Sequence, residues 1–297
     1  MAVIGSAGVL APGKWRPLRA LGWLLLLCIL IVLAYNLVAK AALMLLAPAV
    51  GFDSTNAPAA WKLVASVLGS LALIAAYWGA VRFGERRNVP ELGLRRAPSE
   101  LLLGLGIGAA LLAAIVGLLW LFGWVGIERS VVDRVALALR DSIRSGVLEE
   151  LVLRLIIFRL LWRAFGIWPA LIVAGSLFGV LHLANPDSSL FAAACLIAGE
   201  GVGIGLYLIT GRIWASIGMH AGWNFTQGWI FGGAVSGITD ISGGPLVLKP
   251  VAEVPDWLSG GGFGPEASIA ALVVSLVASA AFLIRAWKMG RFVAEDA

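Results

Sequence analysis

The segment VLEELVLR, residues 147–154, places two adjacent carboxylates and one guanidinium within an apolar stretch that continues to Phe158. A charge at the centre of a membrane helix costs about 3 kcal/mol on insertion scales. Three unpaired charges would oppose insertion. The segment can therefore lie in a bilayer only if its charges are compensated.

Helix geometry offers this compensation. Glu150 and Arg154 are four residues apart, so they can pair on one face of a helix. Glu149 lies about 100° around the helix from Glu150. We therefore expect the two carboxylates to contact different partners, which leaves Glu149 available for another role.

The composition predicts a membrane protein. Of the 297 residues, 60% are hydrophobic and 13% are charged, whereas soluble domains have about 25% charged residues. The mean hydropathy is +0.95. The fold class that we predict is an all-α, polytopic transmembrane helical bundle of about eight spans, each with the roughly 20 residues that a crossing needs. The spans are expected at residues 20–48, 61–83, 100–125, 146–164, 168–185, 188–210, 213–234 and 266–287.

The basic residues indicate the orientation of these spans. They cluster in alternate loops, which predicts an integral protein of a bacterial-type cell membrane with both termini cytoplasmic. The basic loop at 84–99 contains Arg86, Arg87, Arg95 and Arg96, and Arg159 and Arg163 end the fourth span. The net charge of +5 is explained by such loops and does not indicate nucleic-acid binding. One basic loop falls on the wrong side, and its amphipathic pattern predicts an interfacial helix near 127–145.

These assignments divide the chain into four parts. We expect a cytoplasmic arm at 1–19, N-terminal transmembrane helices at 20–144, a catalytic core at 145–235, and an extracytoplasmic loop, last helix and tail at 236–297. The GxxxG pairs in GEGVGIG, residues 199–205, are interpreted as helix-packing glycines. The sequence contains no Walker A loop, CxxC or HExxH motif.

Polar groups recur inside the predicted spans. Both histidines of the chain, His182 and His220, lie there. His220 and Asn224 share a helix face because they are four residues apart. Intramembrane ionisable groups indicate a functional site. For Glu200 two readings stay open: a functional carboxylate, or the partner of an arginine that only holds the bundle together.

Such groups can hydrolyse a peptide bond. A carboxylate in an apolar pocket is a suitable general base for water. A histidine could position that water or protonate the leaving amine, while His220 and Asn224 could donate to the oxyanion of a tetrahedral intermediate. Alternatively, Glu149, His182 and His220 could hold a divalent metal such as zinc.

Three motifs carry a family resemblance. EExxxR stands here as EELVLR (149–154), FxxxH as FGVLH (178–182) and HxxxN as HAGWN (220–224). In this order on successive spans, they resemble the CAAX protease and bacteriocin-processing family, also called the ABI family. The resemblance covers about 145–235.

The resemblance implies an intramembrane endopeptidase with an all-helical fold. It implies that Glu149 activates water with help from His182, and that His220 and Asn224 form the oxyanion hole. The supporting residues would be Glu150, Arg154 and Phe178. The family is often labelled metalloprotease, so both a metal-free mechanism and a divalent metal such as zinc remain open.

The resemblance also implies the substrates. Eukaryotic relatives remove the C-terminal tripeptide from prenylated CAAX proteins, and many bacterial relatives are assigned to bacteriocin maturation or self-immunity. The implied partners are the lipid bilayer and a membrane-associated peptide or protein, either prenylated or bacteriocin-like.

The alternative is a non-proteolytic membrane protein, such as a proton-coupled transporter or an immunity or scaffold protein. Transporters often contain inverted repeats. Because no duplication is recognisable between 20–125 and 146–287, the sequence favours the enzyme.

Overall fold

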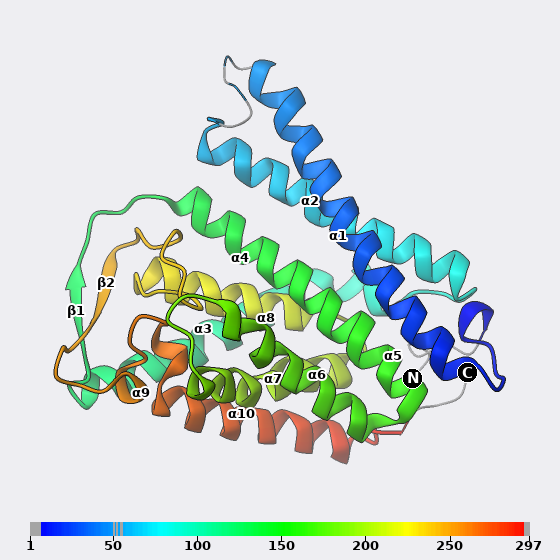
Figure 1. Ribbon diagram of the computed structural model, residues 1–297. Coiled ribbons are helices and arrows are strands. Elements are labelled where there is room, and N and C mark those ends of the chain that lie inside the picture. Colours follow the sequence, from blue (N-terminus) through cyan, green and yellow to red (C-terminus); the bar gives the residue numbers. More distant parts are fainter. Residues whose placement is uncertain (1–6, 50, 52, 54–55, 294–297) are drawn as a thin grey trace.

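A computed structural model describes residues 7–49, 51, 53 and 56–293. The described chain is a helical bundle with one small sheet (Figure 1), which confirms the predicted fold class. The α-helices are α1 (Arg16–Ala49), α2 (Ala59–Gly84), α3 (Ala97–Leu121), α4 (Val135–Glu150), α5 (Arg159–Phe165), α6 (Ile167–Leu181), α7 (Leu190–Thr210), α8 (Trp214–Phe225), α9 (Asp256–Ser259) and α10 (Ile269–Lys288). The strands are β1 (Val125–Arg129) and β2 (Leu246–Pro250). Two π-helical segments are η4 (Leu151–Phe158) and η6 (Thr226–Ile230), and 3-10 turns are η1 (Gly8–Leu10), η2 (Pro90–Leu92), η3 (Leu94–Arg96), η5 (His182–Ala184) and η7 (Pro265–Ala267).

Six helical segments among the described residues are long and apolar enough to cross a membrane. They are Arg16–Leu46, Ala59–Gly84, Pro90–Leu121, Ile167–Ala184, Leu190–Thr210 and Ile269–Lys288. The other two predicted spans, 146–164 and 213–234, both contain predicted site residues. The first contains five charged residues, and α8 with η6 ends at Ile230.

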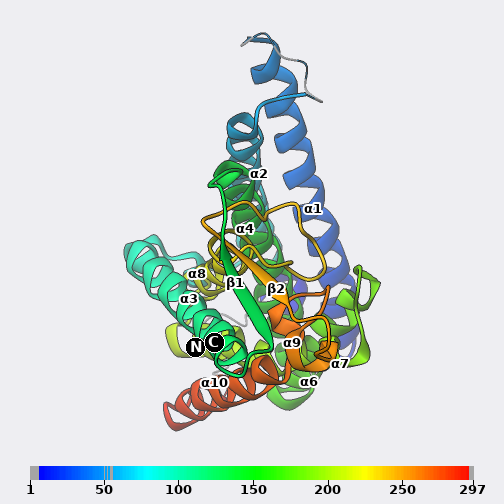
Figure 2. The same ribbon diagram turned by 90° about the vertical axis from the view of Figure 1, so that its left-hand side faces the viewer.

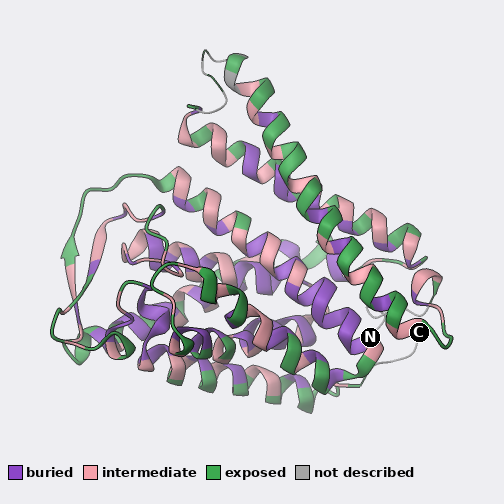
Figure 3. Ribbon diagram, in the orientation of Figure 1, coloured by how far each residue is buried: buried purple, intermediate pink, exposed green. Residues whose placement is uncertain are grey.

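The helices differ in how far they are covered. α1 pairs with α2, and the two extend beyond the rest of the bundle (Figures 1 and 2). α1 is largely exposed, as a lipid-facing helix would be, whereas α7 is largely buried (Figure 3). α4 packs against α2 and α8, and α7 packs against α6 and α10. The helices that carry the predicted site residues therefore meet in the interior.

Helices α3 and α8 approach each other at backbone distance. A Cβ added to Gly104 of α3 would lie 2.1 Å from the carbonyl oxygen of Ala215 in α8, and one added to Gly108 would lie 2.0 Å from that of Met219. Small residues allow such contact between membrane helices. The contact fixes the position of α8 and, with it, His220 and Asn224.

The sheet corrects one prediction. An interfacial helix was predicted near 127–145, but residues 125–129 form β1, which pairs antiparallel with β2. The reason is a period-two pattern: Val125 and Ile127 pack in one apolar cluster with Leu248 of β2. The helix begins only at Val135, and α4, η4 and α5 then form one continuous helix to Phe165 (Figure 1). Its location at the membrane interface stays a prediction.

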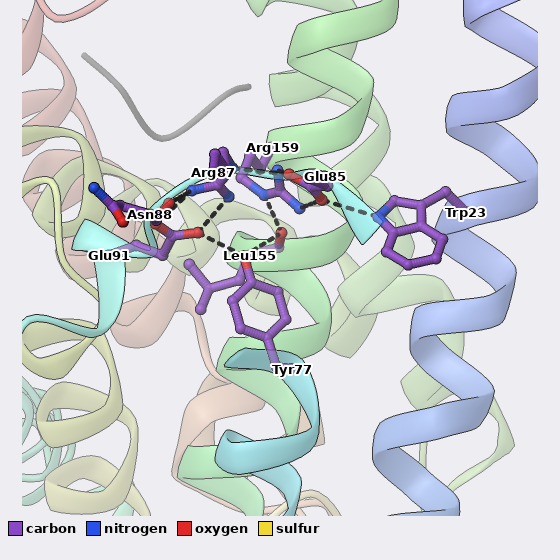
Figure 4. Close-up of polar contacts among 8 residues, drawn as sticks. All are labelled: Trp23, Tyr77, Glu85, Arg87, Asn88, Glu91, Leu155 and Arg159. Carbon is purple, nitrogen blue, oxygen red and sulfur yellow. Dashed lines mark hydrogen bonds and ion pairs between the residues drawn. The ribbon is translucent and has the colours of Figure 1, made fainter. Parts of the chain in front are cut away.

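A buried ion network holds the far end of this continuous helix (Figure 4). Arg159 donates to both carboxylate oxygens of Glu85 at 2.6 and 2.7 Å. Arg87 donates to Glu85 at 2.8 Å and to Glu91 at 2.5 and 3.0 Å. Trp23 and Tyr77 complete the network with hydrogen bonds to Glu85 and Glu91, respectively. Arg87, which was predicted to be a loop charge, is thus partly buried, and Arg159, at the end of a predicted span, is fully buried; both are paired with carboxylates.

The network also includes a backbone carbonyl of the π-helix. The carbonyl oxygen of Leu155 accepts a hydrogen bond from Nε of Arg159 at 2.7 Å. Because Glu85 lies outside the spanning helices, its pKa can be compared with that of a free carboxyl: burial acts to raise it, but Arg159 and Arg87 outweigh burial and lower it.

Candidate active site

The predicted site residues line one cavity of about 410 Å³. Glu149 and Glu150 end α4, and Arg154 lies in η4. Phe178 lies in the last turn of α6, and His182 begins the following turn, η5. Glu200 comes from α7, and His220 and Asn224 from α8. The structure therefore brings together every residue of the three motifs.

Glu150 is the centre of a buried chain of polar groups. Its Oε1 lies 2.9 Å from Nδ1 of His220, and its Oε2 lies 3.0 Å from Nε of Arg154. Arg154 in turn donates to Glu200 at 3.1 Å. The expected pair of Glu150 and Arg154 is present, although its geometry is that of an ion pair and not of an aligned hydrogen bond. Glu200 has an arginine partner, as one of the two readings of this residue required.

Gly203 makes room for this chain. A Cβ at this position would lie 2.1 Å from Nη2 of Arg154. The glycines of GEGVGIG were interpreted as helix packing. Gly201 and Gly205 do face α10, where a Cβ would meet Ser279 and Phe282, but Gly203 admits the guanidinium that joins η4 to α7.

Glu149 and Glu150 contact the same residue, His220, although we expected them to have different partners. Oε2 of Glu149 lies 3.6 Å from Nε2 of His220, on the other edge of the same imidazole. The 100° separation holds for the two side chains along their helix, but a ring inserted between them is within reach of both. Glu149 is one-third exposed, and its Oε2 has no hydrogen bond to any residue that the structure describes. This carboxylate is available to the cavity, whereas Glu150 is engaged.

His182 and Phe178 form a second side of the cavity. Nδ1 of His182 lies 2.8 Å from the carbonyl oxygen of Phe178. A carbonyl only accepts hydrogen bonds, so the proton must be on Nδ1 and Nε2 remains for the cavity. The ring of Phe178 lies 4.4 Å from that of His182 and 6.1 Å from that of His220, between centroids. Phe178 therefore lies against both histidines, which fits a supporting residue.

Asn224 has a partner that the sequence reading missed. Its Nδ2 donates to Oγ of Ser145 at 2.8 Å. One of its two amide hydrogens remains for another acceptor. Ser145 lies four residues before Glu149 on α4, and helical spacing from that glutamate was the signal that could have found it.

A second missed residue is Glu266, in η7. Glu266 is the first residue of the predicted span 266–287 and was given no role, but it is buried and lines the cavity. Burial raises its pKa above the ordinary value, although hydrogen bonds from Ser236 and the charge of His182 act to lower it. The sequence signal for Glu266 was its position, two residues before Ser268, which caps the apolar helix α10.

The geometry offers no ready metal site. Within the described part of the chain, no three His, Cys, Asp or Glu side chains are arranged to hold a metal ion. In particular, Glu150 engages Nδ1 of His220, and Nε2 faces Glu149 at 3.6 Å. Glu149, His182 and His220 are thus not arranged as the ligands of a metal ion.

An apolar pocket of about 280 Å³ adjoins the cavity. It shares Glu149, Phe178, His182 and Asn185 with the cavity, and its other lining residues are Val32, Leu148, Val152, Leu153 and Leu181. The carboxylate of Glu149 thus lies where an apolar and a polar space meet.

Comparison with known proteins identifies the class. An all-helical membrane bundle with a carboxylate and two histidines at an internal cavity has the features of an intramembrane hydrolase. The sequence model described as type II CAAX prenyl endopeptidase Rce1-like matches residues 131–226. This part of the chain is therefore similar to the Rce1-like family, which confirms the family resemblance of the three motifs. No curated protein and no solved structure matches the chain.

The match contains all of the predicted catalytic and supporting residues, from Glu149 to Asn224. It supports a CAAX-type intramembrane endopeptidase in general terms. Together with the six apolar helices, it supports an integral membrane protein whose partners are the bilayer and membrane-associated substrates.

Proposed function

We propose that this protein hydrolyses peptide bonds of membrane-associated substrates, and that Glu149 activates the water. The observation that carries the proposal is the difference between the two adjacent carboxylates. Glu150 is bound to His220 and lies beside Arg154. Glu149 lines the cavity, has no hydrogen bond to the described residues, and approaches Nε2 of His220 only at the longer distance of 3.6 Å. A general base must be free to accept a proton from its substrate.

In the first step, Glu149 takes one proton from a water molecule, and the water oxygen attacks the carbonyl carbon of the scissile bond. The carbonyl oxygen becomes an oxyanion. In the second step, the C–N bond breaks, and the leaving amine takes up a proton. The proton is the one that Glu149 took from the water, passed to the amine directly or through Nε2 of His182, which Phe178 leaves free. The products are a carboxylic acid, which then ionises, and an amine, and Glu149 is again a carboxylate.

The oxyanion would be stabilised by His220 and Asn224. His220 can donate through Nε2 while Nδ1 remains bound to Glu150 if its imidazole carries both protons. Two carboxylates beside the ring favour that cation. Asn224 has one amide hydrogen beyond the one donated to Ser145. Removal of one such donor typically costs about 100- to 1,000-fold in kcat.

The two adjoining spaces favour a substrate of mixed character. The apolar pocket suits an apolar side chain or lipid group next to the scissile bond, and the polar cavity suits the peptide on the other side. Prenylated and bacteriocin-like chains both have this character, and the test must include both.

The experiment uses the full chain in proteoliposomes with internally quenched peptides, one prenylated and one unmodified with an apolar segment. We expect Glu149→Gln to lower kcat about 100- to 10,000-fold, as loss of general-base catalysis does. His220→Ala should also abolish most of the activity. Glu253→Gln, an exposed acid of the external loop, is the matched control. Full cleavage by folded Glu149→Gln and His220→Ala proteins would disprove the mechanism.

A further inference from the structure

Glu266 is a buried carboxylate at the cavity that the proposed mechanism does not use. It lies in η7, between the external loop and α10, and outside the Rce1-like match. Glu266 is 5% exposed, and it lines the same cavity as Glu149 and His182. A charged residue in such a place needs hydrogen bonds that compensate its burial.

These hydrogen bonds come from two segments. Oε1 of Glu266 accepts from the backbone N–H of Ser236 at 2.5 Å and from its hydroxyl at 3.0 Å. Oε2 accepts from Nε1 of Trp223 at 3.2 Å. One carboxylate thereby joins the loop after α8 to α8 itself.

Both segments lead directly to predicted catalytic residues. Trp223 is the residue before Asn224. The carbonyl oxygen of Ser236 accepts from Nδ2 of Asn185 at 3.0 Å, and Asn185 ends the short turn that His182 begins. Glu266 thus contacts the helix of Asn224 directly, through Trp223. It is connected to the turn of His182 through Ser236 and Asn185.

Ser236 also has an unfavourable backbone. Its φ of 50° lies in the left-handed region, which a residue with a Cβ occupies at a cost. Surrounding contacts must hold such a conformation, and Glu266 supplies two of them. The segment held in this way forms one wall of the cavity, with Val235, Ser236 and Ile238.

We infer that Glu266 is a positioning residue of the active site, which holds Ser236 in its left-handed conformation and so fixes the cavity wall, the turn of His182 and the helix of Asn224. This inference rests on the proposed function. Glu266 is not assigned a step with substrate. Its effect is on the geometry of the groups that act in the transition state.

The test measures kcat, KM and the folded fraction for Glu266→Ala and Glu266→Gln in proteoliposomes. Because small displacements of catalytic groups can cost up to about 100-fold in rate, we expect kcat per folded molecule to fall ~10- to 100-fold for Glu266→Ala. KM should change less, since His182 and Asn224 act on the transition state. Should the alanine variant fail to fold, the glutamine variant supplies the same comparison: its amide can accept only through one oxygen, and its NH₂ group opposes the donor of Trp223.

A rescue separates positioning from general stabilisation. Glycine occupies the left-handed region readily, so Ser236→Gly combined with Glu266→Ala should recover part of the lost kcat. Unchanged kcat per folded molecule in the Glu266 variants, or no recovery in the double variant, would overturn the inference. Glu149→Gln in the same series keeps the two proposals apart. If it retains activity, the proposed function fails; if it is inactive while Glu266→Ala is fully active, only the positioning role fails.

Discussion

Replacement of Arg159 by Met should destabilise the protein, because it leaves a buried carboxylate with too few partners. Arg159 makes two hydrogen bonds to Glu85 and one to the carbonyl of Leu155. Removing one partner of a buried ion pair costs about 3–5 kcal/mol. Glu85 keeps Arg87 at 2.8 Å and Trp23 at 2.9 Å, so we expect a cost near the lower end, about 3 kcal/mol.

For a chain of 297 residues, this cost corresponds to a decrease in melting temperature of roughly 5 °C. Thermal unfolding of purified protein in detergent measures it. The variant Arg95→Met, which removes an exposed arginine, should change the free energy of unfolding by at most about 0.5 kcal/mol.

A double-mutant cycle tests the cause. In Arg159→Met with Glu85→Gln, no unpaired charge remains between the two positions. The double variant should therefore be less destabilised than the sum of the two single variants, by ~0.5–3 kcal/mol. Additive effects, or an Arg159→Met protein that melts at the wild-type temperature, would refute the reasoning.

Three further predictions concern the two networks and the mechanism. Gly203→Ala places a Cβ 2.1 Å from the Arg154 guanidinium. Because this displaces the Arg154 side chain, we expect kcat to fall ~10- to 100-fold in the peptide assay. The control Gly106→Ala, whose Cβ would lie in open space, should be active in the same assay. The lowered pKa of Glu85 means that its contribution to stability is present above the ordinary carboxyl value of 4.5 and is lost as the pH falls through the lowered value. Acidification below pH 4.5 should thus reduce the melting temperature of the wild type more than that of Glu85→Gln, and equal reductions would contradict the assignment. If Glu149 activates water alone, dialysis against a chelator leaves the cleavage rate unchanged; loss of activity that zinc restores would show that a metal takes part.

The sequence was sufficient to predict the fold class and the residues that gather at the cavity. Two kinds of local information made this possible. Hydropathy and length identify apolar helices without any knowledge of their packing, and four-residue spacing places His220 with Asn224 and Glu150 with Arg154 on common faces.

Tertiary contacts were beyond such information. The position of the His220 ring between Glu149 and Glu150 depends on how α8 lies against α4. Gly146 of α4 and the glycines of α3 allow α8 to approach closely, and none of them is a site residue. The burial of Glu266 depends on a loop with irregular backbone, for which no periodicity exists. The start of α4 was misplaced because the partner of β1 lies far along the chain, at residues 246–250.

The backbone contact between α3 and α8 limits how this protein could be engineered. Where side chains separate two helices, a larger residue can be accommodated by a change of rotamer. At Gly104 and Gly108 no side chain lies between α3 and the backbone of α8, so no such change is possible. Larger residues introduced along the contact face of α8 would displace this helix, and with it both His220 and Asn224, so most variants of such a library should be inactive. Val152 and Leu181, which line the apolar pocket, are the better positions for mutagenesis aimed at new substrates.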